Sequence, residues 1–276
     1  MITSITNKKV KNIVQLNKKA GQRRKEGVFI AEGIKMFLEA PDSYIQEVYV
    51  SESFLRSLGE GEKSKSTSVG EAATAVREKL KRCGYETAND DVFTKISDTQ
   101  TPQGILCILK QFHYSFEDIM KKEGIPLFLM LESLQDPGNL GTIIRTGEGA
   151  GVTGVIMSKD TVDIYNPKTI RSTMGSVYRV PFLYVEDIVQ TVEKLKRNGI
   201  QTYAAHLKGE KSYYQCDYRS GAAFLIGNEG NGLSAALAET ADEYIKIPMK
   251  GEVESLNAAV SASLLVYEVT RQREGT

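Results

Sequence analysis

Three segments in the second half of the chain each combine a short apolar run, a polar turn and the start of a helical pattern. They read DPGNLGTIIRTGEGAG (136–151), FLIGNEGNGLS (224–234) and IPMKGEVESLNAAVSASLLVYE (247–268). In an α/β sheet, turns of this kind gather at the carboxyl ends of the strands, where small ligands bind. The pattern therefore predicts one ligand site to which all three segments contribute.

The first segment contains the turn sequence Asp-Pro-Gly-Asn, in which proline fixes one dihedral angle and glycine tolerates positive φ. Asn139 is then expected to cap a helix that begins near Leu140. A capped turn does not explain Arg145, which stands among small and apolar residues near the expected strand end. A guanidinium presents a fixed fork of N–H donors that suits phosphate, so an RNA backbone is a natural partner.

The second segment breaks from an apolar run into Gly227, Gly230 and Gly232 with polar residues between them. Glycines let the main chain approach a ligand closely, which is one way to hold an adenine or a ribose. The loop lacks the Lys-Ser/Thr of a phosphate-binding P-loop and does not match the dinucleotide fingerprint. Glu229 has two open roles, as an ion-pair partner of Arg145 or as a polar contact to substrate.

The third segment places Ser255 and Asn257 at the expected start of a helix. Ser255 has the residue type of an N-cap, so a capping role and a role in the site both stay open. Asn257 is a poor helix former, yet it heads the small-residue stretch AAVSAS, which allows close packing against the sheet or another chain. We expect Val260, Leu264 and Tyr267 further along to be core or dimer contacts.

The composition is that of an ordinary globular protein, with 41% apolar and 25% charged residues among 276. No apolar run approaches the roughly 20 residues of a membrane span, and the start lacks the apolar core of a signal peptide. We therefore expect a cytoplasmic protein without a membrane contact. The three cysteines and two histidines have neither disulfide nor metal-site spacing, so we expect no metal and no histidine base.

The length and the change of pattern along the chain predict two domains. A small α/β domain is expected over residues 1–112, with a loop at 60–70, then a linker at 113–125 and a second domain over 126–276. In the second domain, short and nearly continuous apolar runs alternate with helical patterns, which is typical of a mainly parallel sheet buried on both faces. Residues 1–35 hold nine basic and two acidic side chains; this patch is either a solvated helix face or a surface for a polyanion.

The order, wording and spacing of the three segments resemble the signature motifs of the SpoU (TrmH-like) family of RNA ribose 2′-O-methyltransferases, in the SPOUT superfamily. RRKEGVFIAEG (23–33) and TPQGI (101–105) resemble parts of the L30e-like substrate-binding domain of these enzymes. The resemblance implies an α/β fold, the SPOUT α/β-knot, with a deep C-terminal trefoil knot and a preceding L30e-like domain. It also favours RNA as the partner of the basic patch, through Lys8, Lys9, Arg23 and Arg24, together with Arg145.

The implied reaction is the transfer of a methyl group from S-adenosylmethionine to a ribose 2′-hydroxyl, most naturally in 23S ribosomal RNA, by a homodimer. The cofactor positions that the family pattern implies are Gly227, Asn228, Ile247, Met249, Leu256 and Asn257.

The catalytic positions that it implies are Arg145, Asn139, Glu229, Ser255 and Asn257. Because arginine is essentially never deprotonated, we expect Arg145 to hold the phosphate and stabilise the developing alkoxide. Two alternatives remain, a tRNA 2′-O-methyltransferase and a non-catalytic RNA-binding protein of ribosome assembly.

Overall fold

The computed structural model describes residues 1–60 and 67–275, which form two compact units. The first unit comprises residues 1–112 and 165–178, and the second comprises residues 113–164 and the chain from 179 onward. Part of the loop expected at 60–70 lies outside the described residues, and the helix α5 begins at Thr67. Within the described part of the chain, no helix is both long and apolar enough to cross a membrane.

The first unit contains a four-stranded sheet in the order β1-β4-β2-β3. β4 runs antiparallel to both of its neighbours, and β3 runs parallel to β2. The strands are β1 (Val28–Glu32), β2 (Ile45–Ser51), β3 (Glu86–Ala88) and β4 (Ile105–Lys110).

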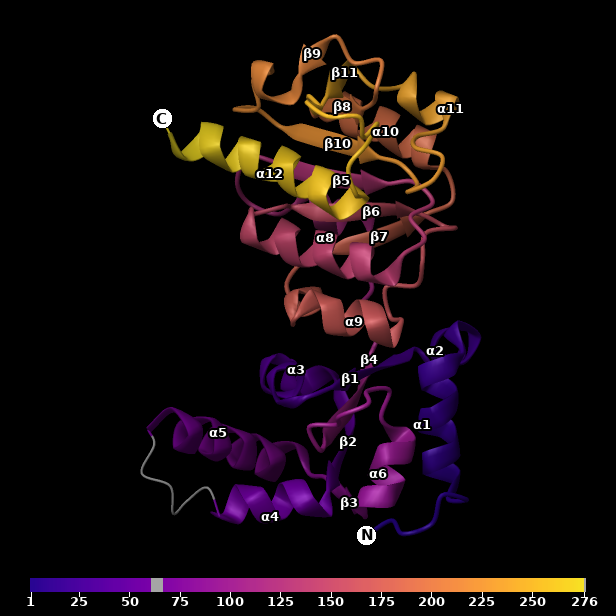
Figure 1. The fold of residues 1–276 in the computed structure, drawn as a ribbon, viewed down its shortest axis with the longest axis vertical. Helices are drawn as coiled ribbons and strands as arrows, with labels where there is room; N and C mark the ends of the chain where they lie inside the picture. The colour runs from indigo at the N-terminus through magenta and orange to yellow at the C-terminus, as the bar shows by residue number, and fades with distance from the viewer. Residues whose placement is uncertain (61–66, 276) are drawn as a thin grey trace. The chain divides into compact units, whose positions relative to one another are not determined.

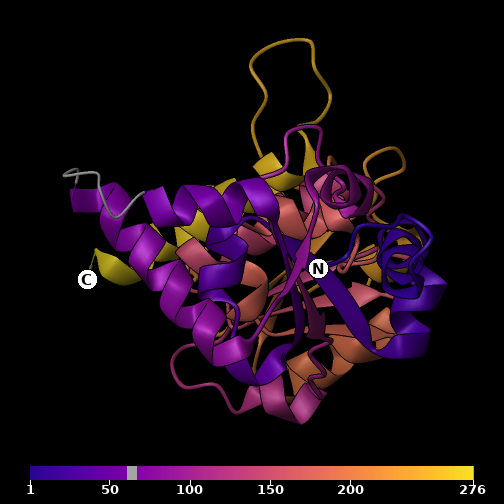
Figure 2. The same ribbon diagram turned by 90° about the horizontal axis from the view of Figure 1, so that it is seen from below.

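Helices cover both faces of this sheet, with α1 and α6 on one side and α3 and α5 on the other (Figures 1 and 2). Val10, Ile13 and Leu16 of α1 are buried, and they pack in one core cluster with α6 and the sheet. The helices are α1 (Lys8–Lys18), α2 (Ala20–Glu26), α3 (Ile34–Glu39), α4 (Glu52–Glu60), α5 (Thr67–Cys83), α6 (Asp90–Ile96) and α9 (Pro167–Thr173), with short 3-10 turns at Asp42–Tyr44 and Ser176–Tyr178.

The helix α9 differs from the expectation that residues 126–276 form a domain by themselves, because it packs in the first unit. The Tyr165 hydroxyl accepts from the backbone N–H of Phe112 at 2.7 Å and donates to its carbonyl at 3.0 Å. Arg171 of α9 pairs with Asp98 at 2.6 Å. The chain therefore leaves the second unit at residue 164 and returns to it at residue 179.

The second unit is built on a seven-stranded sheet in the order β7-β6-β5-β10-β8-β11-β9. Every neighbouring pair is parallel, so the predicted parallel sheet is confirmed. β5, β6 and β10 are buried along their whole length, as their continuous apolar runs predict. The strands are β5 (Leu127–Leu131), β6 (Gly154–Ser158), β7 (Phe182–Val185), β8 (Gln201–Ala205), β9 (Lys211–Ser212), β10 (Ala222–Ile226) and β11 (Glu243–Lys246).

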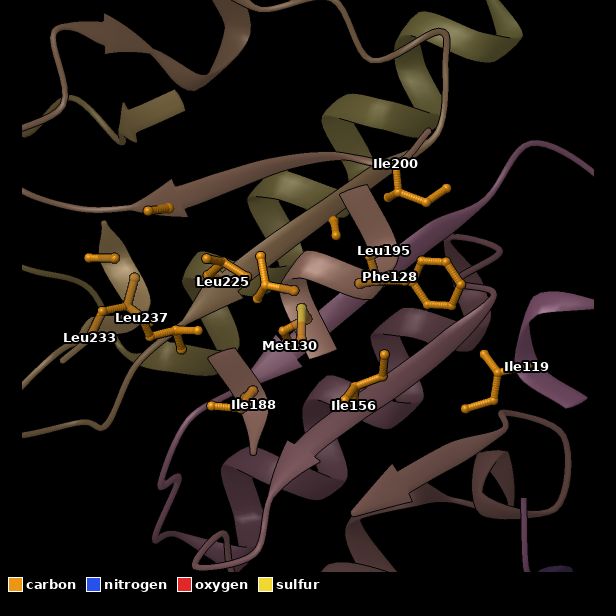
Figure 3. Packing of buried hydrophobic residues seen from close by; sticks show 14 residues of the cluster. Ile119, Phe128, Met130, Ile156, Ile188, Leu195, Ile200, Leu225, Leu233 and Leu237 are labelled. Atoms are coloured by element: carbon orange, nitrogen blue, oxygen red, sulfur yellow. The ribbon is translucent and has the colours of Figure 1, made fainter. Parts of the chain in front are cut away.

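Phe128 and Met130 of β5 point to one face of this sheet, where they pack with Val192 and Leu195 of α10 and Leu237 of α11 (Figure 3). Alternate residues point to the other face, where α8 and α12 lie side by side (Figure 1). The helices are α7 (Phe116–Met120), α8 (Pro137–Gly149), α10 (Ile188–Arg197), α11 (Ala235–Ala238) and α12 (Ala258–Glu274), with a 3-10 turn at Tyr213–Gln215.

The segment 113–125, expected to be a linker, carries the helix α7 in the second unit. Ser115 and Asp118 form a capping box at its start, and the side chain of Ile119 is fully buried in the core beside Gly154. The segment therefore has a packed helix of its own.

Candidate functional site

The three polar segments meet at the carboxyl edge of the seven-stranded sheet. They follow β5, β10 and β11, and parallel strands end on the same side of a sheet. β10 lies between β5 and β8, and β8 pairs with β11, so the four strand ends are consecutive along this edge. The three polar segments therefore lie at one edge of the sheet, as the sequence predicts.

The helix α8 begins at Pro137, and its N-cap is Asp136. The Asp136 carboxylate accepts from the backbone N–H of Asn139 at 2.8 Å. The expectation that Asn139 itself caps this helix is thus wrong, because the chain turns three residues earlier. The Asn139 side chain is left available for contacts with the other two segments.

Glu229, in the loop after β10, connects that loop to the start of α8. Its carboxylate accepts from the backbone N–H groups of Gln135 and Asp136, each at 3.0 Å, and from the Asn139 side-chain amide, also at 3.0 Å. Partial burial acts to raise the pKa of Glu229, but these hydrogen bonds outweigh it and the pKa lies below its usual value. Glu229 is therefore held as an anion and is a poor proton acceptor at neutral pH.

Asn257 joins the third segment to this network. Its amide nitrogen donates to the Asn139 side-chain oxygen at 2.9 Å. Its own oxygen accepts from the backbone N–H groups of Ala259 and Val260, so Asn257 is the N-cap of α12. Of the two roles left open for Ser255, capping is excluded, because α12 begins two residues later than the sequence suggested.

A cavity of about 920 Å³ lies beside this network, and the chain after β8, β10 and β11 lines it. Gly227 packs directly against the far side of its own loop: a Cβ atom there would lie 2.1 Å from the carbonyl carbon of Gly232. Two backbone hydrogen bonds close the loop, from Asn228 N–H to Gly232 O at 3.0 Å and from Gly232 N–H to Asn228 O at 2.9 Å. The loop therefore presents a compact wall of main chain to the cavity.

Most of the residues proposed for the cofactor line this cavity. They are Gly227, Asn228, Ile247, Met249 and Leu256, joined by the proposed catalytic residues Glu229 and Ser255. Asn257 and Asn139 do not line it, and they lie behind Glu229 in the hydrogen-bond network.

Another part of the cavity wall is formed by Ala205, His206 and Leu207, which were not among the residues expected from the sequence. Ala205 is the last residue of β8 and the other two directly follow it, so the carboxyl end of a parallel strand is the signal that could have identified them.

Arg145 lies in the third turn of α8 with an exposed side chain, outside the lining of the cavity. It forms neither a hydrogen bond nor an ion pair with any residue that the structure describes, and the ion pair with Glu229 considered from the sequence is absent. Its guanidinium is therefore open to an anionic ligand.

The four basic residues proposed for RNA in the first unit differ in their surroundings. Arg23 is only 3% exposed, and its guanidinium donates to the carbonyl oxygens of Leu16 and Asn17 at the end of α1. The short helix α2 folds back on α1, which buries this side chain, so Arg23 is not available to a ligand. Lys8, Lys9 and Arg24 are exposed, and Lys9 pairs with Glu86 and Glu47.

Comparisons with known proteins identify the family of this chain. The family model "SpoU rRNA Methylase family" matches residues 126–267, and "MRM3-like substrate binding domain" matches residues 7–107. The chain is 32% identical over 270 residues to the 23S rRNA (guanosine(2553)-2′-O)-methyltransferase RlmP of Bacillus subtilis, covering 97% of this chain and 98% of that one.

Among solved structures, an AdoMet-bound rRNA methyltransferase from Sinorhizobium meliloti is 30% identical, with a TM-score of 0.79 and coverage of 98% and 97% of the two chains. AviRb from Streptomyces viridochromogenes, in complex with AdoMet, is 25% identical with a TM-score of 0.78 over 97% of this chain and 98% of that one. The chain belongs to the SpoU rRNA methylase family.

Proposed function

We propose that this protein transfers a methyl group from S-adenosylmethionine to a ribose 2′-hydroxyl in RNA, with 23S ribosomal RNA as the target. The observation that carries the proposal is the cavity at the carboxyl edge of the parallel sheet. The second and third polar segments line this cavity, and hydrogen bonds of Glu229 and Asn257 with Asn139 join them to the first segment. The family supports the reaction class, and the relative from Bacillus subtilis supports ribosomal RNA as the substrate. Such a target is consistent with a cytoplasmic location.

The groups that line the cavity suit S-adenosylmethionine. Gly227 leaves no room for a side chain, so backbone groups form this wall, while Ile247, Met249 and Leu256 offer apolar contacts. An adenosine bound here would meet backbone donors and acceptors and apolar side chains. When bound, the cofactor supplies an electrophilic methyl group. The trefoil knot expected around this site stays a prediction.

Arg145 is proposed to bind the phosphate of the acceptor nucleotide and to stabilise the negative charge that develops on the ribose oxygen. Its guanidinium stays protonated, and its exposure leaves the donor fork free for phosphate. The N-terminal ends of α8 and α12 are held to the loop after β10 by hydrogen bonds among Asn139, Glu229 and Asn257, and this positioning is their proposed role. Ser255 lines the cavity, where its hydroxyl is proposed to contact the substrate or the cofactor.

The exposed face of α1 is the proposed surface for the RNA backbone. Lys8, Lys11 and Lys18 lie opposite the buried Val10 and Leu16, and they span roughly 15 Å at 1.5 Å of rise per residue. None of the three forms an ion pair with a described residue. Cations arranged in this way would neutralise phosphates without reading the base sequence.

A homodimer through the second unit is part of the proposal. Val260 and Tyr267 of α12 are 47% and 50% exposed, although both are large apolar side chains. They flank Ser263, whose hydroxyl approaches the Thr146 hydroxyl of α8 at 3.4 Å. A second copy placed against this face would bury them. A monomeric mass at micromolar concentration, measured by light scattering, would contradict the dimer without affecting the proposed chemistry.

The direct test is the transfer of labelled methyl from S-adenosylmethionine to unmodified ribosomal RNA and to tRNA, followed by nucleoside analysis. We expect a 2′-O-methylnucleoside in the ribosomal RNA with the wild type, and strongly reduced label with Arg145→Ala. Label in tRNA alone would show that the substrate is tRNA and not ribosomal RNA, and the proposed reaction would stand. Binding of RNA without cofactor binding or methyl transfer would favour the non-catalytic role in ribosome assembly.

A further inference from the structure

Glu132 contacts the chain on both sides of the glycine-containing loop at residues 227–233. Glu132 directly follows β5, and its backbone N–H donates to the carbonyl oxygen of Ile226 at 2.9 Å, just before the loop. Its carboxylate accepts from the backbone N–H of Ser234 at 2.7 Å and from the Ser234 hydroxyl at 2.6 Å, just after the loop. One residue thus spans the base of the loop.

The loop between these contacts is closed on itself. The Asn228 side-chain oxygen accepts from the backbone N–H groups of Gly230 and Asn231, in addition to the two backbone bonds between Asn228 and Gly232. Such a loop moves as one piece, so its placement over the cavity depends on its anchors. Glu229 provides one anchor, the Asn228 amide donates to Ser133 O at 2.7 Å as a second, and Glu132 with Ser234 is the third.

We propose that Glu132 is a positioning residue for the cofactor, and that it acts by fixing Ser234 and thereby the loop that walls the cavity. Glu132 itself does not line the cavity, so its effect must pass through Ser234. Its two contacts to Ser234 are charge-assisted, and such bonds are about twice as strong as neutral ones. This inference rests on the proposed function, because it requires that the cavity binds S-adenosylmethionine.

The test compares cofactor binding and steady-state kinetics of Glu132→Ala, Glu132→Gln and Ser234→Ala. For Glu132→Ala we expect the Kd and KM for S-adenosylmethionine to rise about 10- to 100-fold, the effect of losing hydrogen bonds to a charged group. The kcat at saturating cofactor and the KM for RNA should stay within about threefold, because neither chemistry nor RNA contacts change in this proposal.

Glu132→Gln should restore most of the affinity. Its amide oxygen can accept from Ser234 N–H, and its amide nitrogen can donate to the Ser234 hydroxyl. Ser234→Ala keeps the bond from its backbone N–H and should fall between the two. In the double variant Glu132→Ala/Ser234→Ala, the loss of affinity should be smaller than the two single losses combined, because both changes remove the bond between the Glu132 carboxylate and the Ser234 hydroxyl. Ser234→Ala also removes the hydroxyl that accepts from the Leu237 backbone N–H at the start of α11, at 3.2 Å.

The chain offers a matched control in the same unit. Asp118 accepts from the backbone N–H of Ser115 at 2.9 Å and from its hydroxyl at 2.7 Å, the same pair of contacts, at the start of α7. Asp118 and Ser115 do not line the cavity. Asp118→Ala should leave the cofactor Kd within about twofold of the wild type, since it removes equivalent bonds from an element that does not carry the loop.

Each outcome separates the two proposals. Wild-type protein that fails to bind S-adenosylmethionine overturns the proposed function, whatever the variants do. Wild-type binding with an unchanged Kd in Glu132→Ala overturns the role of Glu132 alone, as does an equal loss in Asp118→Ala. If circular dichroism shows that Glu132→Ala is unfolded, Ser234→Ala decides, and a wild-type Kd in that variant overturns the proposal.

Discussion

Replacing Gly227 by alanine tests the cavity wall more directly than any other single change. The added Cβ would lie 2.1 Å from the Gly232 carbonyl carbon, 2.2 Å from the Leu233 nitrogen and 2.3 Å from the Gly232 oxygen. All three are backbone atoms, so no flexible side chain can give way. The far side of the loop would have to retreat by more than about 1 Å to restore a normal contact.

The expected cost has two parts. Overpacking of this kind destabilises a protein by about 1–3 kcal/mol, and the displaced wall should weaken cofactor binding by at least about tenfold, since about 1.4 kcal/mol corresponds to a factor of ten. The matched control is Gly230→Ala in the same loop, where the nearest atom is the Asn228 side-chain oxygen at 3.4 Å. That variant should bind nearly as well as the wild type.

Calorimetric titration with S-adenosylmethionine and thermal unfolding of both variants provide the measurement. A Kd for Gly227→Ala within about twofold of that for Gly230→Ala, at an unchanged Tm, would refute the assignment of this loop as the cofactor wall. A loss of binding in both variants would show that the loop tolerates no added side chain, and would remove the steric argument from Gly227.

Three further predictions concern charge. Arg145→Lys should lose roughly tenfold or more in kcat/KM, because an ammonium lacks the fork of donors that binds phosphate, and near-normal turnover of this variant would remove the need for a guanidinium. The pKa of Glu229 is lowered in the folded protein, so its contribution to the free energy of unfolding is complete at neutral pH and is lost as the pH falls from about 4.3 through the folded-state value. In Glu229→Gln, the free energy of unfolding should therefore fall less steeply with decreasing pH in this range. An unchanged pH dependence would contradict the role assigned to Glu229. Replacing the α1 lysines by glutamine should reduce the slope of log Kobs for RNA against log salt by about 2, at roughly 0.7 per phosphate; the variant changes Lys8, Lys11 and Lys18. The control variant changes three exposed cations elsewhere, Lys81, Lys194 and Arg197. An equal reduction of the salt slope in this control would show that only the net charge matters and that the position of the lysines does not.

The architecture and the location of the site could be predicted because strongly apolar runs specify buried parallel strands. The segments that form β5, β6 and β10 are nearly continuous apolar runs in the sequence, and all three are buried along their whole length. The motifs then predicted the family and its cofactor, which the comparisons confirm. β9 was missed because two residues carry no periodicity.

The roles of single polar residues could not be predicted from residue type. Asp136 and Asn139 are both good N-caps by type, as are Ser255 and Asn257, and the position at which the chain turns decides between them. The structure selects Asp136 and Asn257. In the same way, a count of basic residues cannot separate the buried Arg23 from the exposed Arg24, because the difference arises from the packing of α2 on α1.

The bonds that unite the site also determine when it forms. Asn139 is 90 residues from Glu229 and 118 residues from Asn257 along the chain, so neither contact arises from local structure. Both contacts require that the strands β5, β10 and β11 are already in place, because these strands carry the three segments to the same edge of the sheet, and the entropy of closing the intervening loops must be overcome first. The helices α8 and α12 and the strands can each exist before their ends are aligned. During refolding, cofactor affinity should therefore return in the final phase, after most of the helical signal has recovered.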